Sequence, residues 1–259
     1  MLIGGFQKTT LVDYPGRVAS IIFTSGCNLR CGYCFNSPLV FSQLPTVSFE
    51  NIFEQLKKNK KLIDAIVVTG GEPTVWPDLP SCLRQLKQEG FSVKLDSNGS
   101  NPEMLDEVIR EGLVDYVAMD IKAPWDCYSQ VTGTAIGSEK FRLSAQMLKE
   151  SGLPYEFRTT AGPGITREDI TAIAAQLKPA DKWYLQSFLP RADVLDKTCK
   201  DRHFLSLAEL EQLAAELAEG FKTCKARGAY NSGDSAANTG QPVPFKPAKY
   251  EITAKWERE

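Results

Sequence analysis

Six apolar segments rich in β-branched residues alternate with amphipathic segments along most of this 259-residue chain. Strands that are separated by helices pair in parallel, through right-handed crossover connections. The pattern therefore predicts an α/β protein whose fold is an open, partial parallel β/α barrel of six strands. The expected strands span residues 18–24, 65–69, 92–96, 116–120, 155–160 and 182–186.

The expected helices lie between these strands, and the last one follows them. Ser48, Asn101 and Thr166 stand where a side-chain oxygen can cap a helix N-terminus, and glycines follow three of the helices. The helices are expected at residues 49–58, 79–89, 102–111, 139–150, 167–177 and about 207–227.

These elements predict one barrel domain over residues 1–228, because a chain of this length can bury a single large core. Residues 231–247 are rich in Ser, Gly, Ala, Asn and Pro and show no hydrophobic periodicity. We therefore expect residues 229–259 to form an irregular C-terminal tail, either docked on the barrel or mobile.

The composition narrows the class of protein. A formal net charge of −2 creates no overall field that would attract nucleic acid. The sequence has no stretch long and apolar enough for a transmembrane helix and no signal-peptide pattern. Seven cysteines, an odd number with one dominant cluster, do not resemble a secreted disulfide framework. We expect a cytoplasmic protein with neither a nucleic-acid nor a membrane partner.

Unusual polar and glycine-rich residues follow the expected strands one after another. A cysteine-rich loop follows the first strand, and residues 69–74, 96–99 and 120–122 follow the next three. Arg158 and Gln186 fall late on the fifth and sixth strands. In β/α barrels the chemistry lies on the loops that leave the C-terminal ends of the strands. The pattern therefore predicts one active site at this rim.

The cysteine-rich loop carries Cys27, Cys31 and Cys34 in the spacing C-x3-C-x2-C. Three thiolates can hold three irons of a [4Fe–4S] cube and leave the fourth iron open to a small molecule. A structural zinc site needs four ligands, yet the nearest other cysteine is Cys82 and the only histidine, His203, is expected to be exposed. The alternative interpretation of these three cysteines is a zinc site or an accidental group of thiols.

This spacing, with Tyr33 just before the last cysteine, resembles the signature of the radical S-adenosylmethionine (radical SAM) enzymes. The run Gly70-Gly71-Glu72-Pro73 resembles the GGE motif of the same family, which holds the amino group of SAM. Glycines let the backbone approach a ligand closely, and a glutamate can pair with an ammonium group. The alternative is an ordinary turn between a strand and a helix.

The turn Asp96-Ser97-Asn98-Gly99 resembles the ribose-contacting turn of radical SAM enzymes, in which Ser97 and Asn98 would meet the cofactor. Asn98 has the donor and the acceptor that ribose hydroxyls require. Because Ser-Asn-Gly is also a common turn sequence, a purely structural role is the alternative.

The run Asp120-Ile121-Lys122 is similar to the Asp-x-Lys of glycyl-radical-enzyme activases, in which Lys122 would meet the carboxylate of SAM. Those activases bind a monovalent cation beside that carboxylate. Asp96, Ser97, Asp120 and the backbone of Ile121 match the cation-binding positions. A simple ion pair between Asp120 and Lys122 at the end of the strand is the alternative.

Three further positions complete the expected site. Arg158 matches an arginine that contacts the ribose and the carboxylate of the cofactor. Tyr33 would lie against the adenine, and a simple packing role is the alternative. Gln186 borders the adenosine site by position alone.

The N-terminal run from Phe6 to Gly16, with the Phe-Thr-Ser-Gly-Cys entry to the cysteines and the run Cys34-Phe-Asn36, resembles activating proteins of anaerobic ribonucleoside-triphosphate reductase. The resemblance extends from about Phe6 to Phe188. It implies a compact activase that cleaves SAM at a [4Fe–4S] cluster and places a glycyl radical on a partner enzyme. Flavodoxin or ferredoxin is the implied reductant.

Two rival functions remain open. One is a radical SAM enzyme that acts on a small molecule or a peptide natural product, and the other is a non-catalytic iron–sulfur or zinc-binding protein. A second cluster is not expected. Cys82 and Cys224 fall on expected helices, and Cys127 and Cys199 lie in loops without a C-x2-C partner, so a redox role for these two stays undecided.

Cys31→Ala tests the assignment of the cysteine ligands. The change should abolish cluster assembly and SAM cleavage together, since both depend on the same three thiolates. Iron and sulfide content and 5′-deoxyadenosine formation are the measurements. Retention of both properties would refute the assignment.

Overall fold

A computed structural model describes residues 1–190 and 194–228. Its strands form one sheet in the order β1-β2-β3-β4-β5-β6-β7-β8. β1 is antiparallel to β2, and all later neighbours are parallel. The strands are β1 (Ile3–Thr10), β2 (Ala19–Thr24), β3 (Ala65–Gly70), β4 (Ser92–Ser97), β5 (Tyr116–Asp120), β6 (Tyr155–Ala161), β7 (Ala180–Ser187) and β8 (Phe221–Arg227).

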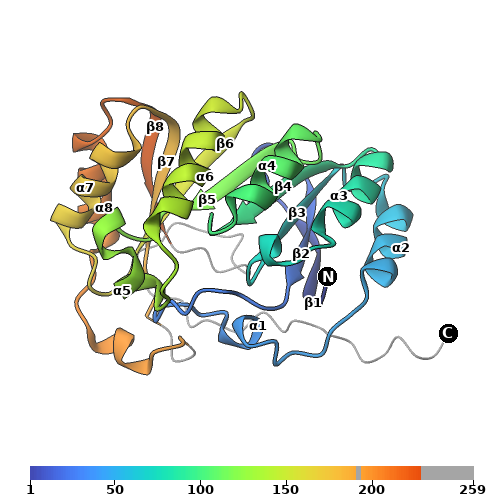
Figure 1. Ribbon diagram of the computed structural model, residues 1–259, viewed down its shortest axis with the longest axis horizontal. Helices are drawn as coiled ribbons and strands as arrows, with labels where there is room; N and C mark the ends of the chain where they lie inside the picture. Colours follow the sequence, from blue (N-terminus) through green and yellow to red (C-terminus); the bar gives the residue numbers. More distant parts are fainter. Residues whose placement is uncertain (191–193, 229–259) are drawn as a thin grey trace.

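The long helices lie along one face of the curved sheet (Figure 1). Ser48, Asn101 and Thr166 each accept a backbone hydrogen bond at a helix N-terminus, as predicted. The helices are α1 (Ser37–Val40), α2 (Phe49–Asn59), α3 (Leu79–Gln88), α4 (Pro102–Arg110), α5 (Tyr128–Thr132), α6 (Ser138–Glu150), α7 (Arg167–Leu177) and α8 (Leu207–Glu216), with short 3-10 helices η1 (Pro73–Val75), η2 (Trp125–Cys127) and η3 (Lys197–Asp201).

The predicted fold class is confirmed, because the first and last strands of the parallel sheet do not pair and the barrel stays open. The predicted count of six strands is wrong, since the sheet has eight strands within the described residues. The two extra strands, β1 and β8, lie at its edges. Glycines and polar residues dilute the apolar pattern of β1, and β8 is only partly buried, so both carry a weak sequence signal.

The last predicted helix is also too long. It ends at Glu216, and Gly220, whose φ of 87° is left-handed, lies in the turn that leads into the next strand. β8 then occupies residues that were expected to be helical. The predicted tail at residues 229–259 lies outside the described residues.

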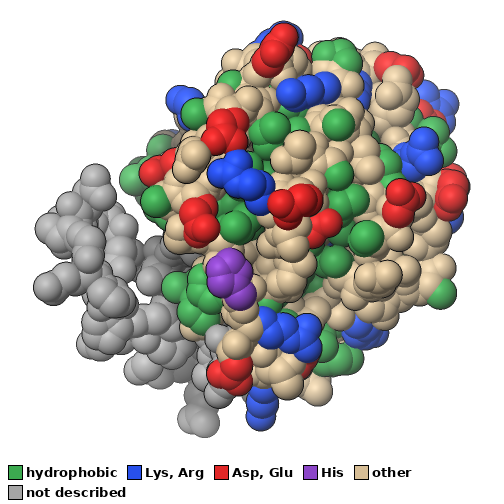
Figure 2. Space-filling view, turned by 90° about the vertical axis from the view of Figure 1, so that its left-hand side faces the viewer, with side chains coloured by type: hydrophobic (Ala, Val, Ile, Leu, Met, Phe, Trp, Pro, Cys, Tyr) green, Lys and Arg blue, Asp and Glu red, His purple; other side chains and the backbone are tan. Residues whose placement is uncertain are grey.

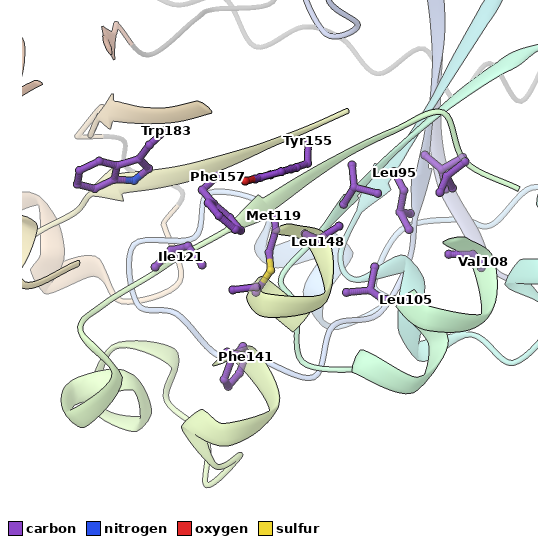
Figure 3. Packing of buried hydrophobic residues seen from close by; sticks show 14 of the residues in the cluster. Leu95, Leu105, Val108, Met119, Ile121, Phe141, Leu148, Tyr155, Phe157 and Trp183 are labelled. Carbon is purple, nitrogen blue, oxygen red and sulfur yellow. The ribbon is translucent and has the colours of Figure 1, made fainter. Parts of the chain in front are cut away.

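The main core lies between the sheet and the helices. Apolar side chains of β4, β5 and β6 point toward α4 and α6 (Figure 3). Since neighbouring residues of a strand face opposite sides, the other set of side chains points to the concave face. A small apolar cluster covers part of that face, and it consists of Tyr14, Ala19, Ile21, Ala65, Val67 and Tyr116. Beyond this cluster the concave face carries charged side chains, among them Asp96, Asp120 and Arg158, and these belong to the candidate site.

Positive and negative side chains are interspersed over the face shown in Figure 2. His203 is exposed, as expected from its charged neighbours. Within the described residues, no helix is both long and apolar enough to cross a membrane.

Candidate active site

The cysteine loop, residues 25–36, connects β2 to α1. Backbone hydrogen bonds fix it at three points: Gly26 N–H donates to Leu39 at 2.7 Å, Arg30 N–H to Thr132 at 2.7 Å, and Cys34 N–H to Cys31 at 3.0 Å. The loop therefore has a defined shape at the C-terminal end of β2.

The three cysteines of this loop lie in an environment that disfavours free thiolates. Cys31 is buried, and Cys27 and Cys34 are half-buried. Burial raises the pKa of Cys27 to about 12 and raises the pKa of Cys31 and Cys34 as well. A thiol here loses its proton at neutral pH only when a cation takes the proton's place, which is the behaviour of a metal ligand.

The three thiols do not converge on one point. Among the described residues, no three His, Cys, Asp or Glu side chains are grouped so that they could hold a single metal ion. A [4Fe–4S] cube offers a separate iron to each thiolate, so its ligands need not converge. The donor set of three partly buried thiols and no fourth ligand fits such a cube.

The turn after β3 is pressed against the cysteine loop. Gly71 N–H donates to Thr24 and Glu72 N–H donates to Gly26, both at 2.8 Å. A Cβ atom on Gly71 would overlap the Gly26 carbonyl, and one on Gly70, whose φ is 119°, would overlap the Thr24 backbone. The two glycines thus allow close approach of the backbone, Gly70 to β2 and Gly71 to the cysteine loop, and their predicted approach to a ligand stays a prediction.

Glu72 is a buried carboxylate at the centre of the site, with 1% of its surface exposed. It accepts hydrogen bonds from Asn98 N–H at 2.6 Å, from the Ser97 hydroxyl at 2.8 Å and from Thr74 N–H at 3.1 Å. Burial outweighs these bonds and raises the pKa of Glu72. Within the described part of the chain no cation is paired with it, so an ammonium group of a ligand would supply the missing positive charge.

Asn98 joins this carboxylate to the cysteine loop. Its side-chain amide donates to Asn28 at 3.0 Å and to the Cys27 sulfur at 3.9 Å, while its carbonyl accepts from Ser100 N–H at 2.9 Å. The predicted ribose contact would therefore compete with these bonds. Asn28 and Ser100, which bond each other at 2.8 Å, were not predicted, and their positions beside Cys27 and Asn98 were the available signal.

A row of alternating charges crosses the ends of β4, β5 and β6. Arg158 donates to Asp120 at 2.9 Å and to Asp96 at 3.1 Å. Lys122 lies 3.2 Å from Asp120, and Lys94 lies 2.5 Å from Asp96. Lys94 was not predicted. Its position two residues before Asp96, which places both side chains on the same face of β4, was the available signal.

The charges in this row hold one another ionised. Burial alone would raise the pKa of Asp120, but Arg158 and Lys122 outweigh it and hold the value at about 2. Arg158 and Lys94 likewise lower the pKa of Asp96. Burial alone would lower the pKa of Lys122, and Asp120 is the main reason that it is raised instead. Lys122 and Arg158 therefore remain cationic near the cysteine loop.

Residues 194–199, the covering segment, follow β7 and pack on the cysteine loop. Leu195 N–H donates to Cys34 at 2.9 Å and Asp196 N–H donates to Gly32 at 2.8 Å. Tyr33 packs against the cluster that this segment forms, and Gly162 lies directly on its ring, because a Cβ atom there would meet the ring at 2.8 Å. The Tyr33 hydroxyl is buried and has no hydrogen-bond partner among the described residues.

Gln186 and the four remaining cysteines lie at separate places in the fold. Gln186 accepts a long hydrogen bond of 3.5 Å from Thr160 at the end of β7. Cys199 lies in the covering segment, where its sulfur would be 3.3 Å from a Cβ atom on Gly32. Cys224 lies on β8 rather than on a helix, which corrects the prediction. Cys82 lies on α3, as expected, and Cys127 in η2.

Comparison with known families identifies the class. The model of the family described as "Radical SAM superfamily" matches residues 21–177, more than half of the chain. The chain belongs to the radical SAM superfamily and is a radical SAM enzyme. Membership implies a [4Fe–4S] cluster and SAM as cofactors, and the three thiols and Glu72 fit these groups chemically.

Individual relatives refine the comparison. The chain is 33% identical over 218 residues to a protein of Methanocaldococcus jannaschii named "Putative glycyl-radical enzyme activating enzyme MJ1227", which covers 82% of this chain and 90% of that protein. It is 27% identical to the pyruvate formate-lyase-activating enzyme of Clostridium pasteurianum over 68% of this chain and 76% of that enzyme. A 7-carboxy-7-deazaguanine synthase of Neisseria meningitidis is 35% identical over 44% of this chain and 47% of its own length.

Solved structures agree on the fold. TYW1 with a lysine-pyruvate adduct bound has a TM-score of 0.57 at 16% identity, over 78% of this chain and 74% of that one. Methylornithine synthase (PylB) has a TM-score of 0.59 at 16% identity, over 79% of this chain and 63% of that one. At these identities the likeness supports the architecture alone.

Gly71→Ala tests the packing of the β3 turn on the cysteine loop. The new methyl group would overlap the Gly26 carbonyl, so the loop must move, at a cost of about 1–3 kcal/mol typical of overpacking. We expect lower stability to urea and a lower iron content after reconstitution. Gly5→Ala is the matched control, because its Cβ atom would meet only Phe23, at 3.4 Å. Equal behaviour of the two variants would contradict this account.

The low pKa of Asp120 predicts a pH dependence of stability. Its pKa of about 2 in the folded state lies below the value of about 3.9 in an unfolded chain, so its contribution is present above pH 4 and is lost toward pH 2. Asp120→Asn should therefore lose less stability than the wild type over this interval, although it is less stable at pH 7. Urea unfolding of the metal-free protein at several pH values measures this. Parallel curves for the two proteins would refute it.

Proposed function

We propose that this radical SAM enzyme is an activase that generates a glycyl radical on a partner enzyme. The observation that carries the proposal is the match to a relative named as a glycyl-radical enzyme activating enzyme, which covers 90% of that relative and 82% of this chain. The match thus extends over most of both chains.

The partner that we propose is the anaerobic ribonucleoside-triphosphate reductase. The support is the N-terminal run from Phe6 to Gly16 and the sequence around Cys34, which resemble the activating proteins of that reductase. Flavodoxin or ferredoxin is the proposed reductant. A cytoplasmic location follows from a reductant and a partner of this kind.

Each residue of the site has a proposed role toward the cofactors. Cys27, Cys31 and Cys34 would hold three irons of the cluster, and Glu72 would pair with the amino group of SAM. Bound there, the cluster and SAM together supply the chemistry, which is reductive cleavage of the sulfonium and removal of a hydrogen atom from the partner. The hydrogen bond from Glu72 N–H to Gly26 keeps this residue against the cysteine loop.

The cationic residues would bind the other end of the cofactor. Lys122 and Arg158 would contact the carboxylate of SAM, because Asp120 keeps both charged and oriented. Ser97 and Asn98 are the proposed ribose contacts and Tyr33 the proposed adenine contact. The segment that packs on Tyr33 would help to exclude water and oxygen.

A monovalent cation is a further proposal at this end of the site. Asp96, Ser97, Asp120 and the carbonyl of Ile121 match the positions that bind one in other activases. Because both carboxylates already bind Arg158, the cation would have to share them with the guanidinium.

A second candidate is a radical SAM enzyme with a small-molecule substrate. The observation that favours it is the 35% identity to a 7-carboxy-7-deazaguanine synthase, although less than half of either chain is covered. The two candidates differ in stoichiometry, since an activase turns over few times for each partner molecule and a metabolic enzyme turns over freely.

The test is anaerobic reconstitution with iron and sulfide, followed by dithionite and SAM. We expect 5′-deoxyadenosine, and with the reductase present an electron paramagnetic resonance signal of a glycyl radical. Cys31→Ala is the control and should give neither product. Deoxyadenosine without the radical would favour the second candidate. Absence of both from the wild type would favour a non-catalytic iron–sulfur or zinc-binding protein.

A further inference from the structure

The concave face continues beyond the charge row toward the open edge of the sheet. Arg158 on β6 is paired in register with Tyr184 on β7, and Tyr184 is paired with Lys225 on β8. One level nearer the rim, Gln186 is paired with Arg227. Register partners on parallel strands point to the same face, so these side chains extend the floor of the site out to the edge strand.

This part of the floor carries more positive than negative charge. Its cations are Lys182, Lys225 and Arg227, and its one carboxylate is Glu156, whose side chain is 3% exposed. Glu156 lies 3.4 Å from Arg227 and accepts from the Tyr116 hydroxyl at 3.0 Å. No described carboxylate lies within ion-pair distance of Lys182 or Lys225, so the surplus is positive.

The floor is ordered by its own contacts. The Arg227 guanidinium stacks on Tyr184, 3.1 Å from the ring centroid. Lys182 lies 5.1 Å from the centroid of the Tyr116 ring and 3.5 Å from its hydroxyl. Stacking fixes a cation without neutralising it. Arg227 is held by this stacking and by its ion pair with Glu156, while Lys182 has no described carboxylate within ion-pair distance and keeps its charge available to an anion.

The opposite face of β8 carries a lysine whose charge is paired. Lys222 points toward the helix side of β8 and forms an ion pair with Asp181 at 2.8 Å. Lys225 is exposed on the concave side, and Arg227 is 29% exposed there. Lys222 is also exposed, but its charge is matched by Asp181, whereas Lys225 has no described carboxylate within ion-pair distance.

We propose that this basic floor, formed by Lys182, Tyr184, Lys225 and Arg227, binds a carboxylate-bearing segment of the partner polypeptide beside the reacting glycine. The inference rests on the proposed function, since it concerns how an activase would select its protein substrate. A segment that reaches Arg158 from the open edge must cross β8 and β7, where cations and an aromatic ring face it. Charge complementarity of this kind selects acidic segments and speeds their association.

Binding of synthetic peptides to the reconstituted full-length protein tests the proposal. The probe is a fluorescent twelve-residue peptide with a central glycine and two adjacent glutamates, and its counterpart carries glutamines. We expect the glutamate peptide to bind about tenfold more tightly, and the difference to shrink at high salt. Peptides with a free or an amidated C-terminus distinguish a side-chain carboxylate from a terminal one.

Lys225→Glu should abolish the preference for the glutamate peptide, and Lys222→Glu, which makes the same charge change on the other face, should keep it. Equal affinities of the two peptides for the wild type, or an unchanged preference in Lys225→Glu, would overturn the proposal. The proposed function fails separately, when the wild type with the reductase gives no glycyl radical signal, because peptide binding is measured without SAM cleavage.

Discussion

The contact between the cysteine loop and the turn after β3 is the constraint on which the site depends. Hydrogen bonds from Gly71 to Thr24 at the end of β2 and from Glu72 to Gly26 in the loop join the first two parallel strands at their C-terminal ends. Only glycine fits at residues 70 and 71, because a Cβ atom would meet the backbone of β2 at the first and of the loop at the second. This contact therefore fixes the position of the buried Glu72 carboxylate relative to the three thiols.

The second constraint is electrostatic. Glu72 is a carboxylate with no cation paired to it among the described residues, and a row that contains Lys122 and Arg158 crosses the ends of β4, β5 and β6. The first would accept the ammonium group and the second the carboxylate of an amino-acid moiety. Together the two groups would suit the methionine part of SAM.

Parts of this arrangement could be predicted from local sequence. The cysteine spacing, the Gly-Gly-Glu run and the polar residues at four strand ends are short patterns with direct chemical meaning. The alternation of strands and helices was sufficient for the class of fold. The edge strands β1 and β8 were missed, because half-covered strands carry little hydrophobic signal.

The sequence by itself therefore determined the fold class, the family and the identity of the residues at the rim. The tertiary structure alone decided that Asn98 bonds Asn28 and Cys27, that Arg158 bridges two carboxylates, and that Lys225 and Arg227 extend the floor. Propensity and spacing act over a few residues, whereas these contacts join strands far apart in the chain. They arise only when the sheet curves and brings the strand ends together.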